Sequence, residues 1–455
     1  MDWLQFNMKS LDESAYKVLY KKNTGFWTTL NDTGSEIVSL LMEGVEKKEI
    51  AQTLSEEYSL EYSDVLKDVS FFIKELTNRI NKYESDAKKY KGIKEKTITI
   101  HITKRCNLKC VYCYNASGIE YTDDPLSKEE ILDVIRQAKK EGFKNITFSG
   151  GEPTIREDFF EIIKEVSEKI KNINITLITN GTLKLSDEKL DSIAKYVNTI
   201  QISLDSCEEE INARTRGAGT LEKIKLFIAE LLKRNFRNFY LATTPLTSEM
   251  SVTPSISTLP QMLRFATNVG AMGLYVNMLK PDGRMDYSQY KQFNIDEYWN
   301  GVHKTYEEQR RLYELGFDNI ALFAGSDFNQ ILEGYCFSEN CGLGCSELAI
   351  NYDGNVYPCA SLMKDDFLLG NIKEMCISDL YKKAYSIYSE CTVDNMEHCK
   401  ECDERYICGG GCRALAYAYS KNISGENPHC KQCKSQIHFW QLMSVNLYQK
   451  DVEND

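Results

Sequence analysis

The chain has 455 residues, 42% of them hydrophobic, and a formal net charge of −12. This length is enough for two to four domains, and no apolar run approaches the roughly 20 residues that span a bilayer. The acidic charge disfavours non-specific binding to nucleic acid, which usually depends on a basic surface. Because the first residues lack the basic and apolar segments of a signal peptide, we expect a cytoplasmic protein with no membrane partner and no nucleic-acid partner.

Cysteine is unusually frequent in this chain. There are 16 cysteines, and most of them lie between Cys336 and Cys433. In a secreted protein such a density would indicate disulfides, whereas in a cytoplasmic protein metal binding or catalysis is the common use. The cysteines therefore point to metal chemistry.

Residues 1–85 form the first predicted unit. The pattern predicts a strand at Phe26–Leu30, then a turn into a helix whose apolar stripe includes Ile37 and Leu41. Two further helices are predicted at Glu49–Tyr58 and Asp64–Ile80. Residues 86–96 are charged and lack apolar periodicity, which indicates a linker, with a partly helical segment as the alternative.

From Thr97 onward, strand-like and helix-like segments alternate. The predicted strands are Thr97–Ile102, Ile146–Ser149, Ile175–Thr179, Ile200–Leu204, Phe239–Thr244 and Gly273–Leu279. The predicted helices lie near 127–142, 158–171, 186–196, 220–235 and 258–270, and a capping box at Ser127 and Glu130 opens the first of them. Such alternation predicts an α/β fold of parallel strands with right-handed crossovers. In barrels of this kind, ligands bind at the carboxyl ends of the strands.

Three cysteines follow the first of these strands, namely Cys106, Cys110 and Cys113, in a Cys-x3-Cys-x2-Cys spacing. A loop this short can bring three thiolates to one inorganic core, and soft thiolates suit iron–sulfur clusters or zinc. Zinc motifs usually pair two Cys-x2-Cys halves and close at four ligands. The spacing therefore favours an iron–sulfur cluster with one open iron, and zinc is the alternative.

Glycine-rich or polar segments end the next three strands. Strand two ends in Gly150-Gly151-Glu152-Pro153, where glycines permit close approach to a ligand and a carboxylate can accept from an ammonium group. Strand three ends in Thr179-Asn180. Strand four ends with Ser203 and Asp205, which are two apart and therefore face the same side. Arg216 lies before the next helix and matches a carboxylate with two hydrogen bonds. A strand-end cap for Asp205 and a solvated surface position for Arg216 are the alternatives.

This combination resembles the radical S-adenosylmethionine (SAM) superfamily. In that family three cysteines hold a [4Fe–4S] cluster, and SAM binds its fourth iron and is cleaved to a 5′-deoxyadenosyl radical. The resemblance implies a partial (β/α)6 TIM barrel over residues 97–330, in which Cys106, Cys110 and Cys113 hold the cluster. It also implies a set of SAM-binding residues, namely Tyr112, Gly150, Gly151, Glu152, Pro153, Thr179, Asn180, Ser203, Asp205 and Arg216. Lys280–Arg284 resembles the family's exit turn after strand six.

Residues 331–455 resemble the SPASM extension of radical SAM enzymes. The resemblance rests on the motif Cys399-x2-Cys402-x5-Cys408-x3-Cys412, followed by Cys430, and on Cys341 with Gly354-x4-Cys359 upstream. The resemblance implies two auxiliary [4Fe–4S] clusters. Cys399, Cys402, Cys408 and Cys430 would hold the distal cluster, and Cys433 could replace Cys430. Cys359 and Cys412 would hold the nearer one, with partners among Cys336, Cys341 and Cys345. Paired structural zinc sites are the alternative for the whole segment.

The first unit resembles the small winged-helix-like domain that recognises leader peptides in ribosomal peptide modification. A leader-peptide domain, a radical SAM barrel and a SPASM extension together resemble the maturases of ribosomally made peptides. The implied partners are a precursor peptide and an external one-electron reductant such as flavodoxin or ferredoxin. The implied reaction is formation of cysteine thioether crosslinks, as in sactipeptides and ranthipeptides. The resemblance does not specify whether sulfur is linked to the α-carbon or to a β- or γ-carbon.

Other reactions remain in view at this point. Carbon–carbon crosslinking, epimerisation and decarboxylation are radical SAM alternatives, and sulfatase-type maturation is another. The non-enzyme alternative is an iron–sulfur scaffold that binds peptides.

Overall fold

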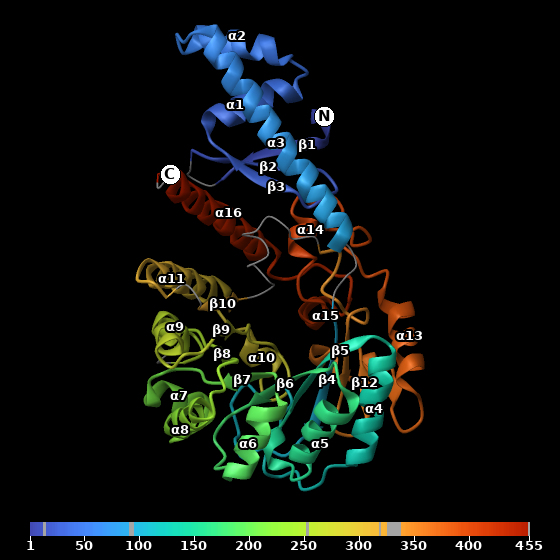
Figure 1. The fold of residues 1–455 in the computed structure, drawn as a ribbon. Coiled ribbons are helices and arrows are strands. Elements are labelled where there is room, and N and C mark those ends of the chain that lie inside the picture. The colour runs from blue at the N-terminus through green and yellow to red at the C-terminus, as the bar shows by residue number, and fades with distance from the viewer. Residues whose placement is uncertain (12–14, 91–94, 252–253, 318–319, 325–337, 454–455) are drawn as a thin grey trace.

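The computed structural model describes the chain except for residues 12–14, 91–94, 252–253, 318–319, 325–337 and 454–455. Cys336 therefore lies outside the described residues. The N-terminal unit, the long C-terminal helix and the barrel follow one another from top to bottom in Figure 1. Within the described part of the chain, no helix has the length and apolar composition needed to cross a membrane.

The N-terminal unit is a three-stranded antiparallel sheet covered by three helices. The strands pair in the order β1 (Phe6–Ser10), β2 (Lys17–Lys21) and β3 (Trp27–Leu30). The helices are α1 (Asp32–Met42), α2 (Lys47–Glu57) and α3 (Tyr62–Tyr90). The structure confirms the predicted strand and the three helices. The sequence did not predict β1 and β2, and α3 continues beyond Ile80, so that residues 86–90 of the predicted linker are helical.

The two faces of this sheet bury different neighbours because successive residues of a strand point to opposite sides. On one face, Leu19 and Leu30 belong to a core cluster with Leu76 and Ile80 of α3. On the other face, Tyr20 and Trp27 belong to the main core, which includes Trp440 of α16 (Cys430–Glu453). The hydroxyl of Tyr20 donates to Oε1 of Gln441 at 3.0 Å. The sheet of the N-terminal unit is thus packed between α3 and the C-terminal helix α16.

The main sheet has ten strands in the order β10-β9-β8-β7-β6-β5-β4-β11-β12-β13, and β4 to β10 pair in parallel with their neighbours. The barrel strands are β4 (Lys96–Thr103), β5 (Phe143–Gly150), β6 (Asn174–Thr179), β7 (Thr199–Ser203), β8 (Phe239–Thr243), β9 (Gly273–Val276) and β10 (Ala321–Ala324). The α/β barrel fold with a mostly parallel central sheet is confirmed, and the strand β10 was not predicted.

Helices cover the outer face of the parallel strands. They are α4 (Lys128–Lys140), α5 (Phe159–Glu165), α6 (Asp187–Tyr196), α7 (Glu209–Arg216), α8 (Thr220–Lys233), α9 (Leu259–Asn268), α10 (Tyr287–Tyr290) and α11 (Ile295–Glu314). The predicted capping box at the start of α4 is present, because Ser127 and Glu130 each bond the other's backbone N–H. The sequence did not predict α7 or α11.

The C-terminal cysteine-rich unit continues the barrel sheet. Strand β11 (Glu347–Ile350) pairs in parallel with β4, and it pairs antiparallel with β12 (Asn355–Tyr357), which in turn pairs with β13 (Gly370–Asn371). A hairpin turn at Asp353-Gly354 joins β11 to β12, and Gly354 adopts a φ of +90°, which favours glycine. The unit ends with α13 (Ile377–Tyr388), α14 (Arg405–Cys408), α15 (Arg413–Ser420) and α16. Because β11 lies beside β4, the cysteine-rich unit is adjacent to the Cys106–Cys113 loop.

Candidate functional site

One cavity of about 1800 Å³ opens at the carboxyl ends of the barrel strands. Its wall includes Cys106, Cys110 and Cys113 from the loop after β4. It also includes six cysteines of the C-terminal unit, namely Cys341, Cys345, Cys359, Cys408, Cys412 and Cys433. The structure therefore brings members of all three predicted cysteine sets to the wall of one cavity.

The cysteine loop is held by the turn that follows β9. Arg284 donates from Nε to the carbonyl of Cys110 at 2.7 Å and from Nη1 to the carbonyl of Ser117 at 2.7 Å. Gly283 lies so close that a Cβ there would be 2.2 Å from the carbonyl oxygen of Cys113. Only glycine fits at this contact, and its φ of +64° also favours glycine. The exit turn named from the sequence thus fixes the loop in place.

The donor set of this loop fits a cubane cluster with one open iron. Three half-buried thiols line the cavity, burial raises the pKa of Cys106 to about 12, and metal binding to a thiol releases its proton. Leu108 N–H lies 3.5 Å from the sulfur of Cys106, which is the kind of N–H···S contact that stabilises a cluster thiolate. No group of His, Cys, Asp or Glu in the described residues is gathered closely enough to hold a single metal ion.

Two glycines bring backbone to the cavity wall beside this loop. A Cβ at Gly150 would be 2.4 Å from the carbonyl oxygen of Thr103, and a Cβ at Gly151 would be 2.0 Å from that of Arg105. Both glycines line the cavity. Any side chain would push the segment away from β4, so these glycines let the backbone pack directly against that strand.

Glu152 lies beneath this wall and differs from the expectation that its carboxylate meets an ammonium group. It is fully buried, and it accepts from Thr154 Oγ1 at 2.6 Å, Thr179 Oγ1 at 2.8 Å and the Asn180 N–H at 2.7 Å. Burial raises its pKa, and these hydrogen bonds oppose the rise. Glu152 caps the short helix that starts at Pro153 and fixes the Thr179–Asn180 turn, and that turn lines the cavity.

Asp205 also lies behind the wall and differs from the expectation that it faces a ligand with Ser203. Strand β7 ends at Ser203, which lines the cavity, and the chain then turns so that Asp205 is fully buried. The Asp205 carboxylate accepts from the hydroxyl of Tyr112 and from Nη2 of Arg216 at 3.2 Å.

Arg216 is delivered to the cavity by α7 and held by Asp205. Its Nε lies 3.0 Å from Oδ2 of Asp205, and its guanidinium stands 5.7 Å from the ring centre of Tyr112. Burial lowers the pKa of Arg216, but the Asp205 carboxylate more than offsets this and holds the pKa above its usual range. The side chain is 8% exposed and lines the cavity, so a fixed cation faces the space where a carboxylate could bind.

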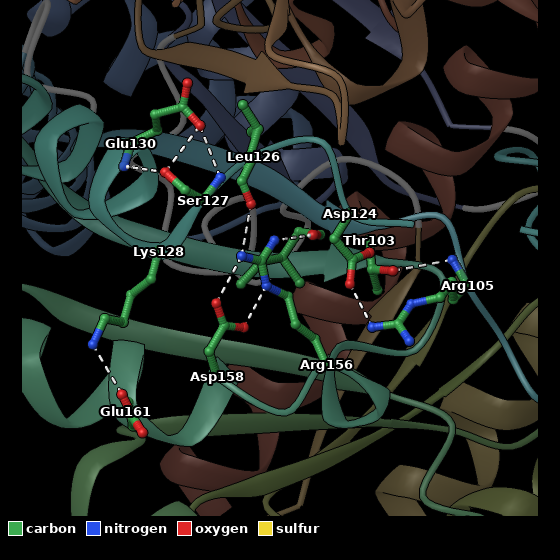
Figure 2. A network of polar contacts seen from close by, with 11 residues as sticks. Thr103, Arg105, Asp124, Leu126, Ser127, Lys128, Glu130, Arg156, Asp158 and Glu161 are labelled. Atoms are coloured by element: carbon green, nitrogen blue, oxygen red, sulfur yellow. Dashed lines mark hydrogen bonds and ion pairs between the residues drawn. The ribbon is translucent and has the colours of Figure 1, made fainter. Parts of the chain in front are cut away.

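Arg156 is a supporting residue that the sequence analysis missed. Figure 2 shows its guanidinium donating to the carbonyl of Leu126 at 2.7 Å and pairing with Asp158 at 2.6 Å. It also donates to the carbonyl of Ile102 at 3.1 Å. The same figure shows Arg105 paired with Asp124 at the start of the cysteine loop. Arg156 is buried and ties the end of β4 to the start of α4. A charged residue shortly after the glycine motif was the only sequence signal.

The near cysteine set comprises Cys341, Cys345, Cys359 and Cys412. The sulfurs of Cys359 and Cys412 are close enough to Cys341 to act on it electrostatically. Lys280, at the end of the barrel, donates to the hydroxyl of Ser361 and faces Cys359 and Cys412. Cys345 lines the same cavity as these three cysteines.

The distal cysteine set comprises Cys399, Cys402, Cys408, Cys430 and Cys433, and the structure brings four of them together, all except Cys402. Cys408 and Cys433 share a hydrogen bond, and electrostatic contacts join Cys399 and Cys430 to Cys408. Cys430 begins α16 and Cys433 lies one turn later, so both present a thiol to the same place. The remaining cysteines described, Cys207, Cys376 and Cys391, lie outside both sets.

Three protein families match successive parts of the chain. The radical SAM superfamily matches residues 100–250, the family of coenzyme PQQ synthesis protein D (PqqD) matches residues 16–79, and the SPASM iron–sulfur cluster-binding domain matches residues 341–403. The matched domains bring a SAM-binding [4Fe–4S] cluster and auxiliary clusters as cofactors.

Several known proteins are similar to the chain. The mycofactocin maturase MftC of Mycolicibacterium smegmatis is 26% identical over 349 residues, which are 73% of this chain and 82% of that protein. The PqqA peptide cyclase of Granulibacter bethesdensis is 27% identical over 333 residues, which are 72% and 85% of the two chains.

Solved structures show the same fold. Streptococcus suis SuiB bound to the precursor peptide SuiA has a TM-score of 0.58 at 16% identity, covering 93% of this chain and 98% of SuiB. The protein anSMEcpe with bound AdoMet and a peptide has a TM-score of 0.60 at 20% identity, covering 78% and 100% of the two chains. With its PqqD-like, radical SAM and SPASM domains joined in one polypeptide, the chain has the domain set of a radical SAM–SPASM peptide maturase.

Proposed function

We propose that the protein matures a ribosomally made precursor peptide by forming cysteine thioether crosslinks. The observation that carries this proposal is the single cavity, whose wall joins the Cys106–Cys113 loop to Cys341, Cys359 and Cys412. A peptide residue in this space would lie between a radical source and a second cysteine site. Bound there, SAM and the clusters would supply a 5′-deoxyadenosyl radical and an acceptor for one electron.

The residues of this chain have separate parts in the proposed reaction. Cys106, Cys110 and Cys113 hold the SAM-binding cluster, and the backbone at Gly150 and Gly151 with Arg216 would bind the amino and carboxyl groups of SAM. Cys359 and Cys412, with Cys341 and Cys345, hold the nearer auxiliary cluster. The distal set of five cysteines holds the other one. For each crosslink, the peptide loses one hydrogen atom from carbon, one thiol proton and one electron, and a sulfur–carbon bond forms.

The N-terminal unit would capture the leader segment of the precursor. Its sheet has two outer strands, β1 and β3, and an extended peptide can add to an outer strand through main-chain hydrogen bonds. Two relatives support a peptide substrate, because one is named as a peptide cyclase and one structure holds a precursor peptide. An external one-electron carrier such as flavodoxin or ferredoxin would supply the electron that starts SAM cleavage.

Carbon–carbon crosslinking is the second candidate, and the likeness to the PqqA peptide cyclase favours it. The test is anaerobic reaction of the reconstituted protein with SAM, a reductant and a cysteine-bearing precursor peptide. A thioether product loses two hydrogens per crosslink and loses one alkylatable thiol for each. A carbon–carbon product loses the same mass and keeps every thiol. A peptide of unchanged mass, with no 5′-deoxyadenosine formed, would refute both reactions.

A further inference from the structure

A buried arginine sits between the two C-terminal cysteine sets. Arg413 directly follows Cys412 and begins α15. It is only 1% exposed, and it is the largest of the fully buried side chains among the described residues. A buried guanidinium is costly unless its charge is compensated, so its surroundings need an explanation.

All the hydrogen-bond acceptors of Arg413 are neutral. Its Nη1 donates to the carbonyl of Gly425 at 2.9 Å and lies 3.2 Å from the sulfur of Met396. Its Nη2 donates to the carbonyl of Gly410, and its Nε to that of Gly411 at 3.3 Å. Within the described residues, Arg413 forms no ion pair with a carboxylate. Its hydrogen bonds are satisfied, but its charge is not neutralised by them.

The groups that can become anionic near Arg413 are cysteine sulfurs. The guanidinium is close enough to Cys399, Cys408 and Cys433 for its charge to act on each of them. These three residues belong to the distal set. The backbone N–H of Arg413 instead donates to the sulfur of Cys341, in the near set. One residue therefore touches both sets, with its charge directed at the distal one.

We propose that Arg413 is the counter-ion of the distal auxiliary cluster and sets that cluster's electron affinity. An iron–sulfur cluster with thiolate ligands is anionic and gains negative charge on reduction, and its potential depends on the charge around it. A fixed buried cation therefore stabilises the reduced form more than the oxidised form. The proposal rests on the SPASM domain match and does not depend on which bond the enzyme makes.

The competing explanation is that Arg413 only bonds the carbonyls of the Gly409–Gly411 segment. Two substitutions separate charge from hydrogen bonding. Arg413→Lys keeps the charge with fewer donors, and Arg413→Gln keeps a donor without the charge. Arg405→Gln is the matched control, because Arg405 lies on the same segment and already pairs with Asp394 at 3.1 Å.

The measurement is an EPR-monitored redox titration of the full chain, in a background where Cys106, Cys110 and Cys113 are alanine. For Arg413→Gln we expect the constant for one-electron reduction of one auxiliary cluster to fall at least tenfold, which is 59 mV. The other cluster is the internal control, and Arg413→Lys and the Arg405 control should change the constant less than threefold. A change below threefold in Arg413→Gln would overturn the proposal.

Iron and sulfide content provides a second readout if a variant assembles poorly. If the charge matters, Arg413→Lys retains more iron per chain than Arg413→Gln. Both variants keep at least two N–H donors, so an iron content in Arg413→Gln that equals or exceeds that in Arg413→Lys would also overturn the proposal.

Discussion

The ammonium of Lys9 lies 2.7 Å from the carboxylate of Asp403. Lys9 belongs to β1 of the peptide-recognition unit, whereas Asp403 follows Cys402 directly in the distal cysteine set. Asn7, on the same face of β1, donates to Asp403 at 2.8 Å. Glu404 joins the same contact, since it lies 3.6 Å from Lys9 and accepts from the thiol of Cys402 at 3.2 Å. The sheet that would receive the leader is thus in contact with a cluster-binding segment.

This contact predicts that Lys9→Gln loosens the N-terminal unit without loss of iron. The side chain of Lys9 is 42% exposed, so its ion pair contributes only about 0.2–1 kcal/mol to global stability. The local effect on β1 should be larger, because Lys9 bridges to both Asp403 and Glu404. Hydrogen–deuterium exchange of the holoprotein should show faster exchange over β1 and β2.

The matched control for that experiment is Lys67→Gln. Lys67 is in the same unit and pairs with Asp64 on the exposed side of α3, away from the cysteines. It should leave exchange in β1 and β2 unchanged. Equal exchange in the Lys9 variant and the parent would show that the contact does not hold the sheet.

Replacing Cys106, Cys110 and Cys113 with alanine should abolish SAM cleavage and keep most of the iron. The three thiols belong to one loop, whereas the C-terminal sets are held by their own segments and by β11 on β4. Measurement of 5′-deoxyadenosine alongside iron and sulfide checks both parts. Turnover that survives the triple substitution would refute the assignment of these ligands.

A substitution at Gly283 tests the clamp on the cysteine loop. The Cβ in Gly283→Ala would lie 2.2 Å from the Cys113 carbonyl oxygen, which forces the loop to move. We expect this variant to lose iron from the SAM-binding site and at least tenfold in SAM cleavage. Gly316→Ala is the control, since Gly316 also has a positive φ, of +88°, but its added Cβ would meet nothing within 4 Å. If both variants behave alike, backbone strain and not the close contact explains the loss.

The sequence predicted the parts of the site that depend on backbone geometry and spacing. Gly150, Gly151 and the three loop cysteines lie where the motifs placed them, because close approach to β4 and a short loop leave few alternatives. The alternation of strands and helices also predicted the parallel sheet, because parallel strands are joined by helical crossovers. The strand β10 was missed, although β3 and β9, which also have four residues, were predicted.

The sequence could not predict which polar side chains face the cavity. Strand periodicity put Ser203 and Asp205 on the same side, but β7 ends at Ser203 and the periodicity ends with it. Glu152 likewise follows the end of β5, where the chain turns under the wall. The place of Cys433 beside Cys430 was also hard to predict from the sequence, because it depends on α16 starting at Cys430. Side-chain direction after an element ends is set by tertiary contacts.

The last prediction concerns Asp205, which holds Arg216 and does not line the cavity itself. Asp205→Asn removes the charge that compensates a buried guanidinium, and breaking such a pair costs about 3–5 kcal/mol when one partner stays charged. Arg216 should then lose its fixed position, so that SAM binds at least tenfold more weakly to the reconstituted protein. Equilibrium binding of SAM, with iron content measured in the same sample, tests this expectation. Asp187→Asn is the control, because Asp187 pairs with Arg234 on an exposed surface and its own side chain is 87% exposed. An unchanged SAM dissociation constant in Asp205→Asn, at full iron content, would show that Arg216 does not bind SAM or does not need Asp205 to do so.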